Sequence, residues 1–273
     1  MDKALSSQLI PTKPLVRWVG GKRKLLSKIL PFVPQKFGTY YEPFFGGGAL
    51  YFALAPKAAV LGDINEELVN FLKVVKESPE ELLRSLRQNT NTKAAYYAMR
   101  ETRPTSAVGK AARFQYLVNL AFGGVFRVNK LGDFNVPYSH ERNRGFFDED
   151  RIKAASALLQ TAEIQCADFT ETVASAKAGD FVYFDPPYTV AHDNNGFLEY
   201  NESIFQWQDQ EKLAALVKTL ARQGVKVLVS NANHSSVRAL YDEKHIQNID
   251  RKSTVSASSD FRGDVKEILV VYN

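Results

Sequence analysis

The segment GDFVYFDPPY (residues 179–188) decides the interpretation of the whole chain. Its apolar run FVYF predicts a buried β-strand, because a short apolar run between turn signals is typical of a strand covered on both faces. Asp185 and two prolines follow at once, and the fixed φ angles of the prolines hold the backbone rigid just outside the sheet. An acid, a rigid carbonyl and the ring of Tyr188 are thereby set at fixed relative positions, which suits a planar heterocycle that carries an amino group.

Strand and helix patterns alternate on both sides of this segment. The segment TYYEPFFGGG (39–48) is predicted to be a strand that ends in a glycine loop. Further strands are predicted at 58–61, 162–169 and 225–233 and in the tail EILVVYN, and helices at 49–55, 65–76, 207–222 and 235–243. This alternation predicts an α/β fold with an open, mostly parallel sheet covered on both faces. In such sheets ligands bind beyond the carboxyl ends of the strands. The glycines from Gly46, with Asp63, Asp168 and Asp185, are expected at that edge.

The remaining segments are predicted to be helices and loops. Residues 22–30 have the pattern of a short amphipathic helix closed by Pro31, and Pro79 is interpreted as a possible boundary. Further helices are expected at 80–88, 107–121 and 148–160, the first two separated by a polar stretch, and a short hairpin is expected around KLGDF.

The glycine loop EPFFGGG (42–48) lies between a predicted strand and a predicted helix. It lacks the GxGxxG spacing of dinucleotide sites and the Lys-Ser/Thr of a P-loop. Asp63, about twenty residues further on, stands where an acid commonly accepts hydrogen bonds from ribose hydroxyls. The alternatives are a tight turn and an acid favoured by the N-terminus of a helix. Together the two features favour a nucleoside ligand without a pyrophosphate.

Positive charge is concentrated in residues 84–144. That segment has eleven Lys and Arg against three acids, a balance of +8 in a chain whose net charge is +5. Aromatic residues are interleaved with the basic ones. This pattern is typical of a surface that attracts the phosphates of a nucleic acid, and the alternative is a solvated helical face.

Composition excludes several other classes of protein. The single cysteine, Cys166, excludes a disulfide framework and a multi-cysteine zinc site, and the four histidines include no pair at helical metal-binding spacing. We therefore predict no metal. No apolar run is long enough for a membrane helix and the first residues lack a signal-peptide pattern, so a cytoplasmic location and no membrane partner are expected.

Five motifs in the same order resemble the Dam-type DNA adenine methyltransferases (class α, D12). They are WVGGK (18–22), EPFFGGG (42–48), GDIN (62–65), FNVP (134–137) and DPPY (185–188). The resemblance covers nearly the whole chain. It implies a Rossmann-like methyltransferase domain at 10–76 and 162–273, with a mostly helical DNA-recognition insert at 77–161 that coincides with the basic segment.

The resemblance also assigns residues to S-adenosyl-L-methionine. Trp18 and Lys22 would hold the cofactor. Without the resemblance, the local sequence favours an ordinary buried tryptophan and a solvated lysine. Glu42, Pro43, Gly46 and Gly48 would line its methionine end, Asp63 would bind its ribose, and Asp168 with Phe169 would face its adenine ring. Phe44 and Ile64 are further cofactor residues. Asp185 would also border the cofactor, and Cys166 is interpreted as an inert core thiol.

The chemistry expected of this site is methyl transfer to the N6 amino group of an adenine that is flipped out of double-stranded DNA. Asp185 and the Pro186 carbonyl would accept the two N–H bonds of that amino group, and Tyr188 would stack on the base. The loop 189–203 could close over the base through Phe197 and Tyr200, or be an ordinary surface loop. The motif SNAN (230–233) is expected at the ligand edge, where it can touch that loop or DNA, whereas His234 is interpreted as structural.

The expected DNA contacts lie in the insert, and GATC or a GATC-like site is the predicted target. The candidate residues are Arg113, Phe122, Arg127, Asn129, Pro137, Tyr138, His140 and Arg142. Two departures from the family pattern bear on the GATC assignment: Gly123-Gly124 replaces a common Asn-Gly, and His140 stands where the family has arginine. Histidine offers at most one donor to a base, so guanine readout at residue 140 is expected to be weaker or supplied elsewhere. Arg142 and Arg144 are close enough in the chain to substitute.

Alternative functions are an RNA adenine methyltransferase, a protein-amide methyltransferase, a nucleotide-dependent oxidoreductase, and an inactive DNA-binding protein on the same scaffold. The missing GxGxxG argues against the oxidoreductase, and Asp185 with Tyr188 argues against the inactive protein. We expect a monomer associated with the nucleoid of a bacterium or with a phage. The sequence does not reveal whether a restriction enzyme is its partner.

Overall fold

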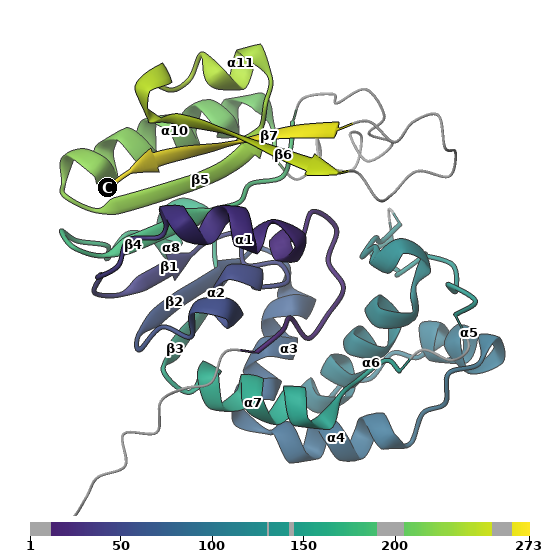
Figure 1. The fold of residues 1–273 in the computed structure, drawn as a ribbon. Helices are drawn as coiled ribbons and strands as arrows, with labels where there is room; N and C mark the ends of the chain where they lie inside the picture. The colour runs from purple at the N-terminus through teal and green to yellow at the C-terminus, as the bar shows by residue number, and fades with distance from the viewer. Residues whose placement is uncertain (1–11, 130, 142–144, 190–204, 253–263) are drawn as a thin grey trace, which may run out of the picture. The chain divides into compact units, whose positions relative to one another are not determined.

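The computed structural model describes residues 12–129, 131–141, 145–189, 205–252 and 264–273. For residues 250–252 and 264–266 it describes the backbone alone. The chain forms two compact units (Figure 1). Unit 1 comprises the N-terminal segment up to Arg23 together with Phe45–Ala167. Unit 2 comprises Lys24–Phe44 together with Asp168–Asn273. Each unit is thus built from two separate stretches of sequence.

Five strands of the sheet belong to unit 2. They are β1 (Tyr40–Glu42), β4 (Phe181–Phe184), β5 (Lys226–Ala232), β7 (Asp264–Tyr272) and β6 (Ile246–Lys252), in the spatial order β1-β4-β5-β7-β6. The first three are parallel, with Tyr40 opposite Phe181 and Phe184 opposite Val229. β7 runs antiparallel to both of its neighbours. The strands predicted at FVYF, at 225–233 and in the tail are confirmed, whereas β6 was not predicted.

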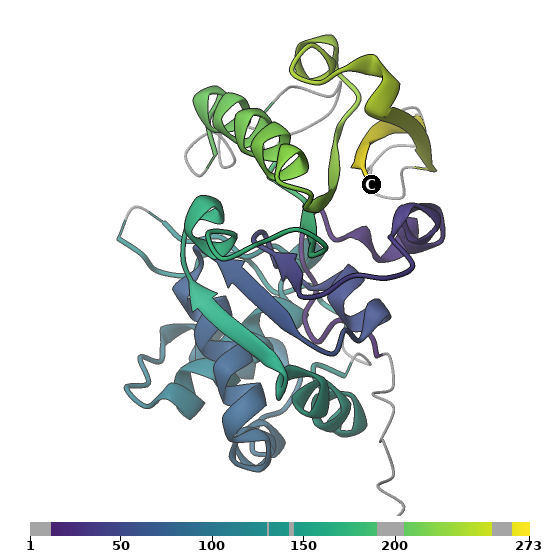
Figure 2. The same cartoon turned by 90° about the vertical axis from the view of Figure 1, so that its left-hand side faces the viewer.

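Helices cover both faces of these strands. Figure 2 shows α8 (Phe169–Thr172) and α10 (Trp207–Arg222) on one side and α1 (Leu26–Ile29) on the other. The helix predicted at 22–30 is divided into η1 (Lys22–Leu25), α1 and η2 (Leu30–Phe32). Pro31 stands in the first turn of η2 instead of closing a helix, because the first helical positions need no N–H donor.

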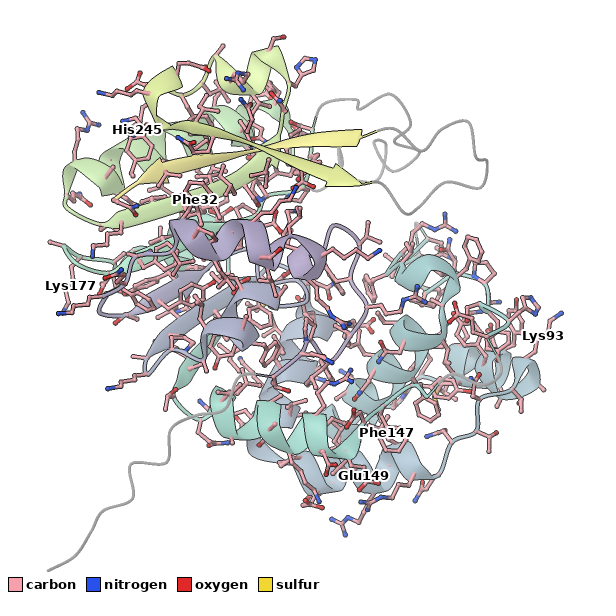
Figure 3. The ribbon with its side chains drawn as sticks, in the orientation of Figure 1. Phe32, Lys93, Phe147, Glu149, Lys177 and His245 are labelled. Atoms are coloured by element: carbon pink, nitrogen blue, oxygen red, sulfur yellow. The ribbon has the colours of Figure 1, made fainter. Side chains whose placement is uncertain are left out.

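The segment after β5 is less helical than the sequence predicts. It contains α11 (Ser235–Arg238) and η4 (Glu243–His245) instead of one helix over 235–243. His234 is the N-cap of α11, and its Nδ1 accepts the Ser236 N–H. The prediction that His234 is structural agrees with this geometry. The ring of His245, labelled in Figure 3, stacks on Tyr272 with 4.0 Å between ring centroids.

Unit 1 contains two parallel strands, β2 (Ala59–Asp63) and β3 (Ala162–Cys166), paired over their whole length. Helices α2 (Ala49–Leu54) and α3 (Glu66–Glu77) follow the glycine loop and β2, as the sequence predicts. Asn65 is the N-cap of α3 and accepts the Leu68 N–H. Cys166 ends β3 with an exposed side chain, so its interpretation as a core thiol is wrong. The thiol is still partly desolvated by its neighbours. This desolvation and the nearby acids Glu66 and Asp63 raise the pKa of Cys166, so the thiol is protonated at neutral pH.

The rest of unit 1 is mostly helical. Its helices are α4 (Pro79–Arg87), α5 (Lys93–Glu101), α6 (Ala107–Leu120), the turn η3 (Phe122–Gly124) and α7 (Glu149–Leu159). α6 packs against α3, α4 and α5, and its residues 111–120 are all buried. α5 lies in the polar stretch where no helix was predicted, and Pro79 is the first residue of α4.

The hairpin predicted around KLGDF is confirmed. Val128 and Phe134 form an antiparallel bridge, and the Asn129 N–H donates to the Asp133 carbonyl. The side chain of Asn129 accepts the N–H groups of Leu131 and Asp133 and so closes the turn. Leu131 at the tip of this hairpin is largely exposed.

The alternation of strands and helices defines an α/β fold of the Rossmann-like kind. In unit 1 β2 and β3 are parallel, and in unit 2 β1, β4 and β5 are parallel and β7 is antiparallel. Within the described ranges, none of the helices is both long and apolar enough to cross a membrane.

Candidate functional site

The predicted DPPY turn follows β4 in unit 2. All four residues of β4 are buried, Asp185 is half-buried, and Pro186 is buried. Ser230 on the neighbouring strand β5 donates its hydroxyl to Oδ1 of Asp185 at 2.6 Å. The carboxylate is therefore fixed at the carboxyl end of the parallel strands, where ligands bind in this class of fold.

Glu42 ends β1 and is buried at 2% exposure. Its Oε2 accepts the hydroxyl of Tyr40 at 2.9 Å. Burial raises the pKa of Tyr40 well above its usual value, and the neighbouring charge of Glu42 raises it further, with smaller contributions from Tyr183 and Asp185. Tyr40 is therefore neutral at neutral pH and donates its hydroxyl proton to the Glu42 carboxylate.

Aromatic rings gather beside Phe44 in unit 2. Phe44 stacks on Phe169 with 5.4 Å between ring centroids, and Phe205 contacts both rings edge-on. The Lys212 ammonium lies 5.1 Å from the centroid of the Phe169 ring and 3.6 Å from Oδ1 of Asp168. This group offers flat apolar surfaces next to a carboxylate.

Asp168 is the N-cap of α8. Its Oδ1 accepts both the backbone N–H and the hydroxyl of Thr170. Burial alone would raise the pKa of Asp168, but the hydrogen bonds from Thr170 and the charge of Lys212 lower it. The carboxylate is thus ionised at neutral pH and able to accept further hydrogen bonds.

Asp63 ends β2 in unit 1 and holds the glycine loop. Its Oδ2 accepts the Gly46 N–H and its Oδ1 accepts the Asn65 N–H, each at 2.9 Å. Burial raises the pKa of Asp63, and these N–H bonds oppose the rise. Ile64, the next residue, is exposed.

Gly46 and Gly48 have positive φ angles, and Gly46 packs against Trp18. A Cβ at Gly46 would lie 2.7 Å from Cδ1 of the indole, so no larger residue fits there. Trp18 is half-buried and lies near Phe114 and Phe126. Lys22 is buried and its Nζ donates to the Gly20 carbonyl at 3.0 Å, so it is not a solvated lysine.

The predicted DNA-contact residues fall into two groups in unit 1. The exposed group consists of Phe122, Arg127, Asn129, Pro137 and His140. The buried group consists of Arg113 and Tyr138. Arg142 and the loop residues Phe197 and Tyr200 lie outside the described residues.

Arg113 is bound within the fold. It is 8% exposed, its Nη2 donates to the Arg100 carbonyl at 2.9 Å, and its Nη1 lies 3.9 Å from Glu67. Burial lowers the pKa of Arg113, and the charge of Glu67 opposes this. Tyr138 is also internal, since its hydroxyl donates to Oδ1 of Asn91 at 2.6 Å. The structure therefore places both side chains inside unit 1, and this placement does not support the prediction that they contact DNA.

The turn before Arg127 explains one departure from the family pattern. Gly123 and Gly124 both have positive φ angles. A Cβ at Gly124 would lie 2.5 Å from Cβ of Arg17, whereas a Cβ at Gly123 would meet only Val125 at an ordinary 3.5 Å. Since asparagine tolerates a positive φ, the Gly123 position accepts Asn or Gly, and the Gly124 position requires Gly.

Sequence reasoning missed the contacts of two residues of α10, Gln210 and Lys212. Gln210 is fully buried, and its Nε2 donates to the Pro187 carbonyl at 3.4 Å. A signal was present, because Gln210 shares the helical spacing of the buried positions Leu213, Ala214 and Val217. A polar residue on an apolar helix face requires a partner.

Comparison with known proteins gives the family. The model of the D12 class N6 adenine-specific DNA methyltransferases matches residues 18–255. The chain is 37% identical to the Type II methyltransferase M1.LlaDCHI of Lactococcus lactis, over 97% of each chain. It is 34% identical to the Type II methyltransferase M.MjaIII of Methanocaldococcus jannaschii, over 95% of this chain and 98% of the relative. It is 28% identical to the DNA adenine methylase of Haemophilus influenzae, over 95% and 93% respectively.

The chain therefore belongs to the D12 class of N6 adenine-specific DNA methyltransferases. It is an adenine-specific DNA methyltransferase, and the resemblance drawn from its five motifs is confirmed.

Proposed function

We propose that this enzyme transfers a methyl group from S-adenosyl-L-methionine to the N6 amino nitrogen of an adenine flipped out of double-stranded DNA. The observation that carries the proposal is the fixed carboxylate of Asp185, held by Ser230 at the end of β4 and followed by two prolines. An adenine amino nitrogen is a poor nucleophile, because its lone pair is delocalised into the ring. A fixed acceptor for its N–H bond localises that lone pair on the nitrogen.

The residues present fit S-adenosyl-L-methionine chemically. Asp63, whose carboxylate already orders the glycine loop, is suited to accept the ribose hydroxyls, and the close approach of Gly46 to Trp18 leaves backbone where a side chain would intrude. Phe44 and Phe169 offer ring surfaces for the adenine, and the Asp168 carboxylate beside them accepts N–H groups. Glu42 supplies negative charge toward the methionine end. The remaining residues that we assign to the cofactor are Lys22, Pro43, Gly48, Ile64 and Asp185. When bound, the cofactor supplies an electrophilic methyl group on a sulfonium ion.

The chain's own contribution to transfer is positioning. Asp185 and the Pro186 carbonyl accept the two N–H bonds of the target amino group, and Tyr188 stacks on the flipped base. Asp185 also stabilises the positive charge that develops on the nitrogen. The proton of that nitrogen is released by way of the Asp185 carboxylate toward water.

DNA is contacted by the insert, which we assign to residues 77–161, between methyltransferase segments at 10–76 and 162–273. The exposed residues Phe122, Arg127, Asn129, Pro137 and His140 follow one another along the loop and hairpin of 122–140. Arg127, whose Nε donates to Asn135 at 2.8 Å, is suited to a phosphate or a guanine edge. Arg142 is also proposed to contact DNA, whereas Arg113 and Tyr138 are bound within the fold and are left out of the proposed set. The proposed target is GATC or a GATC-like site, and the enzyme acts as a monomer in association with cellular or phage DNA.

The test is to sequence methylated adenines in DNA after incubation of the purified chain with S-adenosyl-L-methionine. We expect N6-methyladenine at GATC or closely related sites, and none with Asp185→Ala at wild-type thermal stability. Methylation confined to an unrelated site would overturn the GATC assignment. Transfer by Asp185→Ala within about tenfold of the wild-type single-turnover rate would overturn the role of Asp185.

A further inference from the structure

We propose that Ser230 positions Asp185 for catalysis, and that Asn231 and Gln210 hold the same turn from the other side of the sheet. This inference rests on the proposed function, because it concerns the orientation of the two acceptors assigned to the target amino group. Its starting point is β5, where two neighbouring polar residues, Ser230 and Asn231, are fully buried and the other buried residues are apolar. Buried polar groups need partners, so the identity of those partners shows what the pair is for.

The partners of Ser230 define a directed chain of hydroxyl groups. The Ser230 hydroxyl donates to Oδ1 of Asp185 at 2.6 Å and lies 3.1 Å from the hydroxyl of Tyr183. A hydroxyl has one proton, and an ionised carboxylate only accepts. The proton of Ser230 therefore points to Asp185, and Tyr183 donates to Ser230. This arrangement fixes the rotamer of Ser230 and, through it, the plane of the Asp185 carboxylate.

Asn231 acts on the opposite face, because successive side chains of a strand alternate. Its Nδ2 donates to Oε1 of Gln210 at 3.0 Å, and Nε2 of Gln210 donates to the Pro187 carbonyl at 3.4 Å. Gln210 is fully buried on α10. Two adjacent residues of β5 therefore hold the DPPY turn at two points, the Asp185 side chain and the Pro187 carbonyl.

Pro186 lies between these two points, and its carbonyl is the second proposed acceptor. Fixing the residues on both sides sets the direction of that carbonyl as well as that of the carboxylate. Rate is sensitive to such placement, because a small misorientation of the reacting groups slows a positioned reaction more than it weakens binding. Loss of the Ser230 hydroxyl should therefore reduce the rate of transfer and leave cofactor and DNA affinity intact.

The experiment compares Ser230→Ala with Ser230→Thr in single-turnover methyl transfer at saturating S-adenosyl-L-methionine and DNA. We expect Ser230→Ala to lower the rate constant about 10- to 100-fold, the effect of one hydrogen bond to a charged group, with both dissociation constants within about twofold of wild type. Ser230→Thr, which keeps the hydroxyl, should restore most of the rate. The matched control is Tyr41→Phe, which removes a hydroxyl that contacts Ser175 in the same unit and should leave the rate unchanged.

Tyr183→Phe separates positioning from simple packing and serves if Ser230→Ala does not fold. It should slow transfer by a smaller factor, and the double variant Ser230→Ala with Tyr183→Phe should be no slower than Ser230→Ala, because Tyr183 acts through Ser230. A wild-type rate in Ser230→Ala, or rates that follow thermal stability across these variants, would overturn the proposal. The proposed function fails separately, if the wild-type chain itself forms no N6-methyladenine.

Discussion

The backbone N–H of Gly46 donates to Oδ2 of Asp63 at 2.9 Å, so the glycine loop and the end of β2 share one carboxylate. The other oxygen of that carboxylate accepts the Asn65 N–H at the start of α3. Asp63 therefore orders two loops of unit 1 before any ligand binds. This dual attachment makes the effects of changes at Asp63 and at Gly46 predictable.

Asp63→Ala should weaken binding of S-adenosyl-L-methionine by roughly 1–3 kcal/mol, because charge-assisted bonds to the ribose are lost. Isothermal titration calorimetry measures this directly. Asp148→Ala is the matched control, since Asp148 also accepts a backbone N–H as the N-cap of α7, outside the proposed cofactor residues. Unchanged affinity in Asp63→Ala would refute the ribose assignment.

Gly46→Ala should destabilise the protein more than Gly132→Ala. Both glycines have positive φ angles, which cost an L-residue about 1–2 kcal/mol. Only at Gly46 does the added Cβ meet a side chain, 2.7 Å from the indole of Trp18, whereas nothing lies within 4 Å at Gly132. Urea unfolding at equilibrium would give both values, and equal losses would contradict the packing argument.

Arg127→Gln should lower the slope of log K for DNA binding against log salt by about one unit, if the guanidinium contacts a phosphate. Arg113→Gln should leave that slope unchanged and instead lower the unfolding temperature, because Arg113 is buried and bound to the Arg100 carbonyl. Fluorescence anisotropy over a salt series, together with thermal melts, tests the pair. A lower slope in Arg113→Gln at wild-type stability would contradict this expectation and indicate that Arg113 contacts a DNA phosphate.

Glu149→Gln should reduce stability at neutral pH and lose its effect in acid. Glu149, labelled in Figure 3, accepts two hydrogen bonds from Arg87 and so joins α7 to α4. The hydrogen bond from Arg87 lowers the pKa of Glu149, so the contribution is present above the unfolded-state pKa and is lost as pH falls through the folded-state pKa. The unfolding midpoints of the two proteins should therefore differ at pH 7 and converge once the pH falls below the folded-state pKa of Glu149. A difference that persists in acid would point to packing instead of charge.

His140→Arg should tighten discrimination against sites that lack guanine. Arginine makes two parallel bonds to a guanine edge, worth about 1–3 kcal/mol of discrimination. Arg and His both carry a Cβ, so the positive φ of residue 140 costs them a similar amount. Methylation rates at GATC and at single-base variants give the comparison, with His140→Ala as the control. Equal discrimination by the wild type, His140→Arg and His140→Ala would show that residue 140 takes no part in guanine recognition.

Periodicity predicted the central elements because they combine apolar strands with clear turn signals. FVYF, for example, is fully buried as β4, and Asp63 and Asp185 stand at strand ends where the pattern placed them. The motifs gave the family for the same reason, since each combines a strand end with residues of restricted conformation. Their assigned roles in binding and catalysis stay predictions.

Counting charges could not separate surface arginines from internal ones. Arg113 belongs to a basic segment, yet α6 packs against three helices and leaves residues 111–120 buried. Burial is set by the neighbours of a helix, and one sequence does not reveal them. The strand β6 was missed for a related reason, because its place is set by pairing with β7. The helix α5 was missed although its sequence carries a local signal: Thr92 caps it by accepting the Ala95 N–H.

The division of unit 2 into two stretches of sequence has a consequence for the order of folding during synthesis. Thr39 donates its N–H to Asp180 across 141 residues, and β1 pairs with β4 over a similar separation. A ribosome must therefore complete Phe45–Ala167 before the partner strand of β1 emerges. Contacts of such long range are slow to form, whereas the helix contacts of unit 1 span shorter separations, as those of α6 with α3, α4 and α5 do. The nascent chain should acquire a folded unit 1 first, and the turn that holds Asp185 only when its last strands are released.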